Sequence, residues 1–167
     1  MSLCPGKNQE NSGNLQGDSR GKIKWVTLNF VAFALDEAMR KGMGKIIVLN
    51  RNLSSLFGYA EVLNEMGYYS LSLCTNINEV FDLLKAGENF EYLVYDAFDL
   101  SKDANYLEMI AGFCAIFSIV TVSDVNSTQR QSVILWARSY AIPLRGVLQA
   151  PLRSAELYEL IEGSGPY

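Results

Sequence analysis

From residue 44 onward, short apolar runs alternate with longer segments whose apolar residues recur at helical spacing. The first run, KIIVL at 45–49, is continuously apolar after its lysine, as in a strand buried on both faces of a sheet. Five strand-then-helix units indicate one α/β domain with a doubly wound five-stranded parallel sheet. The predicted strands cover residues 45–49, 69–74, 91–95, 117–122 and 145–148.

Capping residues and glycines mark the ends of the predicted helices. Ser54 precedes a periodic segment that ends at Gly67. Asn76 and Glu79 have the spacing of a capping box, before a segment that ends at Gly87. Ser154 is the predicted cap of the closing helix. Further helices are predicted over 106–113 and 128–140.

Residues 1–43 differ in composition from the rest of the chain. Residues 1–21 are rich in Gly, Ser, Asn and Gln and poor in large apolar residues, which predicts a disordered tail. Residues 22–43 carry apolar side chains at helical spacing, which predicts an extra N-terminal helix, with a strand over 23–33 as the alternative. The expected organisation is completed by the α/β domain at 44–163 and a short tail at 164–167.

The apolar residues of the predicted N-terminal helix, among them Trp25 and Leu28, spread around most of its circumference. Such a helix needs more than one partner surface. We therefore expect a homodimer to which this helix contributes. The partner surface is expected on a late helix that carries Trp136 or Tyr158.

The sequence contains no histidine, which excludes a histidine general base and every histidine-ligated metal site. Its three cysteines are too far apart for a zinc site. The net charge of −4 gives no basic surface for a nucleic acid partner. No signal-peptide pattern opens the chain, and the uncharged run at 25–35 is shorter than the ~20 residues that span a bilayer. A cytoplasmic protein without a membrane partner is expected.

Chemistry in an open parallel sheet gathers beyond the carboxyl ends of the strands. Each predicted strand except the second brings a polar residue or a proline to this edge. These residues are Asn50 and Arg51 after the first strand, Asp96 at the end of the third, Thr121 and Ser123 near the end of the fourth, and Ala150 and Pro151 after the fifth.

The strand and helix order, the aspartate after the third strand, the hydroxyl after the fourth and the segment GVLQAPL at 146–152 together resemble the receiver domain of two-component response regulators. The resemblance covers residues 44–163 and implies a flavodoxin-like topology. It also implies that Asp96 holds the phospho-acceptor position and Ser123 the switch hydroxyl, with Thr121 as the alternative. Pro151 then follows a cis peptide bond.

Three positions depart from the family pattern. Asn50 and Arg51 replace the acidic pair that helps to hold Mg²⁺, and Ala150 replaces the lysine that reads the phosphate. Mg²⁺ prefers carboxylate oxygens, so this edge is a poor metal site. Arg51 is instead expected to pair with Asp96, to lower the pKa of that carboxyl and to hold one conformation. The resemblance therefore implies a degenerate receiver without a metal or another cofactor.

A second resemblance involves the fourth unit. The stretch VSDVNSTQRQSVILWARSYAIPLRGVLQAPLRSAEL at 122–157 is similar to receivers that are joined to EAL-type cyclic-di-GMP phosphodiesterases. It rests on spacing and apolar pattern. No EAL catalytic sequence occurs in this chain, so the phosphodiesterase is expected in another polypeptide or in a part of the protein beyond this sequence.

These observations favour a non-catalytic signalling module that works without phosphorylation, through a protein partner in a bacterial pathway or through dimerisation. Two alternatives stay open. One is a working receiver that accepts a phosphoryl group on Asp96 with Mg²⁺. The other is a flavodoxin-like protein that binds a small molecule or a nucleotide, although no glycine-rich phosphate loop follows the first strand.

Overall fold

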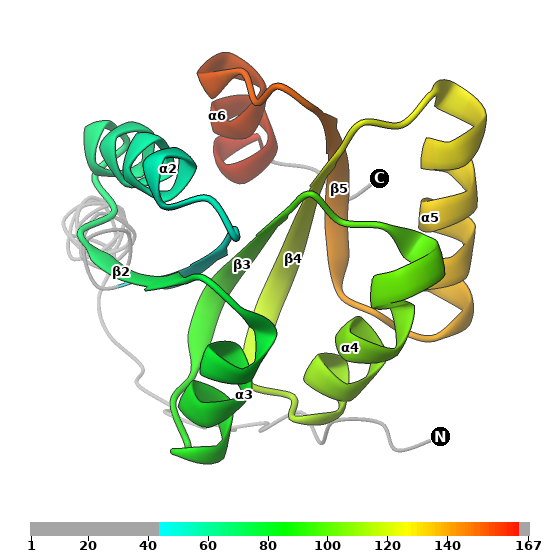
Figure 1. The fold of residues 1–167 in the computed structure, drawn as a ribbon, viewed down its shortest axis with the longest axis horizontal. Helices are drawn as coiled ribbons and strands as arrows, with labels where there is room; N and C mark the ends of the chain where they lie inside the picture. The colour runs from blue at the N-terminus through cyan, green and yellow to red at the C-terminus, as the bar shows by residue number, and fades with distance from the viewer. Residues whose placement is uncertain (1–43, 164–167) are drawn as a thin grey trace, which may run out of the picture.

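The computed structural model describes residues 44–163, which form one α/β unit (Figure 1). The predicted tails at 1–21 and 164–167 and the predicted helix at 22–43 lie outside these residues. In chain order the elements are β1 (Lys45–Leu49), α2 (Leu53–Glu65), β2 (Ser70–Cys74), α3 (Ile77–Lys85), β3 (Phe90–Asp96), α4 (Leu100–Gly112), β4 (Ile116–Ser123), α5 (Ser127–Ser139), β5 (Leu144–Gln149) and α6 (Ser154–Glu162).

The five strands form one parallel sheet in the order β2-β1-β3-β4-β5. This is the flavodoxin-like topology that the sequence predicts, and each observed strand agrees with its predicted range to within one residue at either end. Because all strands run the same way, their carboxyl ends meet at one edge of the sheet and their amino ends at the other.

Helices cover both faces of the sheet, α2 and α6 on one face and α3, α4 and α5 on the other (Figure 1). Strand β1 shows why: Ile46 and Val48 pack with α2 and α6, whereas Ile47 and Leu49 pack against the opposite layer. All four side chains are buried. Successive residues of a strand point to opposite faces, so a continuously apolar strand has to be covered on both sides.

Two of the predicted helix boundaries are confirmed in detail. Asn76 caps α3, and its side chain accepts hydrogen bonds from the backbone N–H groups of Asn78 and Glu79. Gly67 and Gly87 follow α2 and α3 with φ of +92° and +82°. Side chains rarely adopt this left-handed conformation, so glycine suits both turns.

Three helix starts differ from prediction. Asn52 rather than Ser54 caps α2, and Arg153 rather than Ser154 precedes α6. Helix α4 begins at Leu100, not at Tyr106. The six residues at its start, LSKDAN, have little apolar periodicity, so the sequence pattern did not predict this part of the helix. None of the described helices is long and apolar enough to cross a membrane.

Candidate functional site

The carboxyl edge of the sheet brings the predicted site residues together. Asn50 follows β1, Asp96 ends β3, Ser123 ends β4 and Ala150 follows β5. The Ala150 N–H donates to the Ser123 carbonyl oxygen at 3.0 Å, which joins the ends of β4 and β5. The Ala150–Pro151 peptide bond is cis, as the family resemblance implies.

Asp96 is held by an amide rather than by a cation. The Asn50 side-chain Nδ2 donates to Asp96 Oδ2 at 2.6 Å, and the Ala97 backbone N–H donates to Oδ1 at 2.7 Å. Asn50 is itself fixed, because its Oδ1 accepts from the Asn52 N–H at 2.8 Å. Both oxygens of the Asp96 carboxylate therefore accept a hydrogen bond from their own edge of the sheet.

Receiver-like folds imply Mg²⁺ at this edge, and the donor set here does not fit that ion. Mg²⁺ takes oxygen ligands in a near-octahedral arrangement. The Asn52 N–H occupies the oxygen of the Asn50 side chain, so Asn50 presents an N–H donor to Asp96 instead of a ligand. Arg51 adds a cation to the same cavity. Among residues 44–163, no group of three or more His, Cys, Asp or Glu residues is arranged to hold a metal ion.

The expected pairing of Arg51 with Asp96 is wrong. Arg51 is exposed, and none of the ion pairs within the described part of the chain joins it to Asp96. Asn50 takes the place that Arg51 was expected to fill, because a short amide reaches the carboxylate from the end of β1 without leaving its backbone contact to Asn52.

The two candidate switch hydroxyls are both buried and differ in their partners. Ser123 Oγ donates to the Phe98 carbonyl oxygen at 2.8 Å, so it is directed to the β3–α4 connection. Thr121 lies deeper in the sheet, in register with Tyr95, and its Oγ1 makes no hydrogen bond within the described residues. The edge position of Ser123 matches the predicted switch position better than that of Thr121.

Two pairs of a tyrosine and a nearby aspartate at this edge were not predicted from the sequence: Tyr95 with Asp103, and Tyr59 with Asp96. Asp103 is buried in the first turns of α4, and its Oδ2 accepts from the Asp99 N–H at 2.8 Å. Burial, and then the nearby Asp103 carboxylate, raises the pKa of the Tyr95 hydroxyl. Burial, and then the charge of Asp96, likewise raises the pKa of Tyr59 on α2. The aspartate spacing at 99 and 103, next to a capping position, was the available signal.

A cavity of about 430 Å³ opens beside Asp96. Its lining includes the cations Arg51 and Lys102 and the carboxylates Asp96, Asp99 and Asp103. Lys102 Nζ lies 3.1 Å from Asp99 Oδ2, an exposed ion pair. The charges in this cavity are mixed, so it lacks the concentrated negative field of a divalent-cation site.

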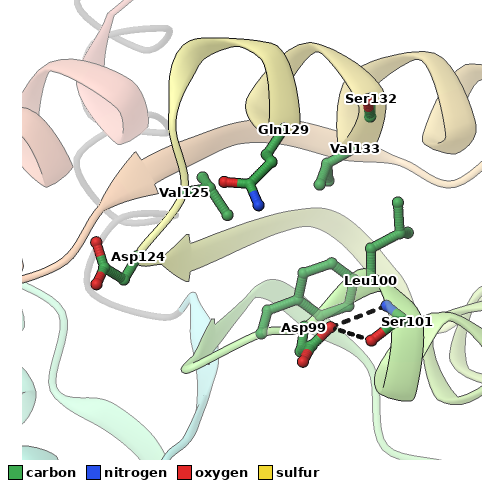
Figure 2. Close-up of a pocket in the computed structure, with 9 residues that line it drawn as sticks. Asp99, Leu100, Ser101, Asp124, Val125, Gln129, Ser132 and Val133 are labelled. Carbon is green, nitrogen blue, oxygen red and sulfur yellow. Dashed lines mark hydrogen bonds between the residues drawn. The ribbon is translucent and has the colours of Figure 1, made fainter.

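A second cavity, of about 530 Å³, lies between the start of α4 and the β4–α5 connection (Figure 2). Phe98, Leu100, Val125 and Val133 give it an apolar lining, and polar groups at the helix starts border it. Figure 2 shows one of these groups, Asp99 Oδ1, which accepts hydrogen bonds from the N–H and the Oγ of Ser101.

Aromatic contacts lead from the Asp96 edge to helix α5. The Phe98 ring lies edge-on to Tyr95 at 5.4 Å between centroids and stacks on Trp136 at 6.1 Å. Trp136 also contacts Tyr140 and donates from Nε1 to Glu108 of α4 at 3.3 Å. Trp136 is therefore half-buried, with part of its ring packed in the domain.

No family model matches this chain, and no curated protein matches it. Among solved structures, a response regulator from Thermotoga maritima has a TM-score of 0.58 at 16% identity, covering 71% of this chain and 94% of that one. The CheX–CheY complex with BeF₃ and Mg²⁺ from Borrelia burgdorferi gives 0.56 at 10%, covering 71% and 86%.

A response regulator from Burkholderia pseudomallei, solved with a phosphorylated aspartic acid, a calcium ion and citrate, has a TM-score of 0.53 at 19% identity. That match covers 72% of this chain and 67% of the other. These likenesses establish the fold: residues 44–163 adopt the α/β architecture of response-regulator receiver domains.

Proposed function

We propose that this protein is a receiver-like signalling module without catalytic activity, which holds one conformation without phosphorylation. The observation that carries the proposal is the hydrogen bond from Asn50 Nδ2 to Asp96 Oδ2. A phospho-acceptor needs a carboxylate oxygen positioned to attack phosphorus and a metal to neutralise the transferred group. Asp96 has both oxygens hydrogen-bonded and an amide where the metal would be ligated.

The position of Ser123 supports the same proposal. In a working receiver this hydroxyl reads the phosphoryl group, as the family resemblance implies. Here Ser123 donates instead to Phe98, two residues beyond Asp96, and is buried in that position. Ala150 offers only a methyl group where the resemblance implies a lysine. Charge developing on a phosphoryl group at Asp96 would thus lack its usual neutralisers.

The output of such a module is a surface that a partner recognises. We propose a protein partner in a bacterial signalling pathway, in line with the partner-bound CheY among the similar structures. The resemblance of residues 122–157 makes an EAL-type phosphodiesterase the first class of partner to test, by pull-down with the purified chain.

The decisive experiment is a titration with beryllofluoride and Mg²⁺. Replacing Trp25→Phe leaves Trp136 as the reporter, and its stacking on Phe98 couples it to the Asp96 loop. We expect no saturable change in its emission and no phosphoryl mass gain from acetyl phosphate. A saturable change that Asp96→Asn abolishes would establish the working receiver instead.

A matched gain-of-function variant controls for an insensitive reporter. The triple change Asn50→Asp, Arg51→Asp and Ala150→Lys restores the acidic pair and the lysine that the resemblance implies. In the same Trp25→Phe background, this variant should respond to beryllofluoride and Mg²⁺ while the parent does not.

We also infer a homodimer in which the exposed side of α6 takes part. Tyr158 leaves about half of its side chain exposed there, at 51%. Light scattering on the full chain should give the mass of two copies, and Tyr158→Arg should shift it toward one. A wild-type monomer at every concentration would remove the homodimer and leave the first proposal standing.

A further inference from the structure

Helix α4 carries an apolar face that the rest of the described domain does not cover. Tyr106, Met109 and Phe113 follow each other at spacings of three and four residues, so they share one side of the helix. All three are exposed, Met109 to 57%. Phe117, four residues beyond Phe113 and near the start of β4, is exposed to 75%. We call these four residues the α4 patch.

The α4 patch has a fixed aromatic backing. The ring of Phe81 on α3, which is buried, lies 6.4 Å from the ring of Tyr106 and 6.3 Å from that of Phe113. Helices α3 and α4 lie side by side on this face of the sheet (Figure 1). Tyr106 and Phe113 thus share the Phe81 ring, Met109 lies on the same side of α4, and Phe117 follows close along the chain. Exposed apolar side chains that lie this close together are more than the single exposed residues of an ordinary monomer.

Phe113 and Phe117, just after α4 and near the start of β4, lie at the amino edge of the sheet, where the described chain begins, whereas Tyr106 lines the cavity beside Asp96. The register places Lys45 of β1 at the level of Glu91 in β3, and Glu91 at the level of Phe117 in β4. Two strand spacings, about 10 Å, thus separate the first residue of β1 from the backbone of Phe117. Gly44, the first described residue, therefore lies near the Phe117 end of the patch.

Residues 22–43 have the composition that this surface requires. Trp25, Leu28, Val31 and Leu35 recur at helical spacing, and apolar residues occur on most sides of the expected helix. A helix of this length would extend about 33 Å, longer than the about 20 Å of α4. We propose that residues 22–43 dock as a helix on the α4 patch of their own domain. The opposite side of this helix then stays available to a second copy.

The test reads the environment of Trp25 in the full chain. Trp136→Phe leaves Trp25 as the only tryptophan. We expect its emission to be blue-shifted and protected from acrylamide. Met109→Asp should shift the emission to the red and increase quenching at least twofold. Phe117→Ser should do the same to a smaller extent, and both variants are checked for unchanged far-ultraviolet circular dichroism.

Phe57→Asp is the matched control, because Phe57 is exposed to 62% on α2, on the opposite face of the sheet. It should leave Trp25 unchanged. The proposal is overturned if Trp25 is solvent-exposed in the parent, if Met109→Asp has no effect, or if Phe57→Asp has the larger effect.

Dilution distinguishes the chain's own segment from that of a second copy. If the segment docks on its own domain, Trp25 keeps its emission at concentrations where mass photometry finds monomers. A red shift that accompanies dissociation would assign the patch to the partner's segment and contradict the proposal. A protein that is monomeric throughout, with Trp25 protected, would support this proposal while removing the homodimer.

Discussion

The two edges of the sheet differ in how far their side chains find partners within the domain. At the carboxyl edge, the polar groups pair among themselves: Asn50 with Asp96, Ser123 with Phe98, and Gln149 with Asp124 at 3.0 Å. The amino edge carries the exposed Lys45–Glu88 ion pair and also exposed aromatic side chains, among them Phe117.

This difference indicates where the protein has unmet interactions. The carboxyl edge is the usual ligand-binding edge of such sheets, and here its hydrogen bonds are largely closed within the domain. The amino edge leaves apolar area in water, which a covering segment or partner would remove. The contribution of the carboxyl-edge hydrogen bonds to stability can be measured by removing them one at a time.

The largest effect is expected from Asn50→Leu. The change removes the donor to Asp96 and the acceptor for the Asn52 N–H at a position that is buried. A hydrogen bond to a charged group contributes more than a neutral one, so we expect a loss of about 2–3 kcal/mol in the free energy of unfolding.

Urea denaturation measures this loss, with Asn105→Leu on the exposed side of α4 as the control. A stability equal to that of the control would show that the Asn50–Asp96 contact does not hold this edge together.

Ser123→Ala should have a smaller effect of the same sign. It removes one buried hydrogen bond, to the Phe98 carbonyl, and leaves that oxygen without the hydroxyl. The expected loss is about 1 kcal/mol, measured as a lower urea midpoint with an unchanged slope. Ser54→Ala, at an exposed hydroxyl on α2, gives the reference. An increase in stability would contradict the role given to Ser123.

Thr121→Val should act in the opposite direction. The Thr121 hydroxyl is fully buried without a hydrogen bond in the described structure, and valine has nearly the same shape. Removing an unsatisfied polar group is expected to stabilise the fold by about 0.5–1 kcal/mol. Thermal unfolding beside Ser123→Ala makes the comparison direct. If Thr121→Val is instead destabilised, the prediction fails, because the Thr121 hydroxyl must then make a favourable hydrogen bond.

The smallest effect concerns the two capping carboxylates. Hydrogen bonds from the Ser101 side chain, and then Lys102 and the Ser101 N–H, lower the pKa of Asp99. The Thr75 N–H is the largest cause of the lowered pKa of Glu79. A carboxyl with a lowered folded pKa stabilises the fold above its unfolded pKa, and this contribution is lost as the pH falls through the folded value.

The double variant Asp99→Asn and Glu79→Gln should therefore be less stable than the parent at pH 7 and equal to it near pH 2, below the usual carboxyl range of about 4. Urea midpoints at the two pH values measure the difference. A gap that persists at the lower pH would mean that charge is not the cause.

The strands and their order follow closely from local pattern. Each strand is a short apolar run between turn residues, and the need to cover both faces of such runs leaves few topologies. Helix α4 was harder to locate, because residues such as Lys102 and Asp103 interrupt the apolar periodicity of its first turn. Its start is set by the Asp99 cap, whose side chain accepts from the Ser101 N–H; the aspartate at this position was the one signal of the cap in the sequence.

The site, too, could be predicted from the sequence only in part. Sequence position alone brought Asn50, Asp96, Ser123 and Pro151 to one edge, since the end of a parallel strand can be counted from its apolar run. It gave the wrong partner for Asp96, Arg51 instead of Asn50. That choice depends on side-chain reach and on the competing Asn52 N–H, and both are set by the path of the chain after β1.

What the sequence by itself determined is the sheet, its topology and the identity of the residues at its carboxyl edge, because strand periodicity and chain connectivity are local properties. Only the tertiary structure decided which of those residues are partners, that Ser123 donates a hydrogen bond to the Phe98 carbonyl, and that Trp136 stacks on Phe98. These are contacts between residues far apart in the chain. Their distances depend on how whole layers pack, which no short window of sequence contains.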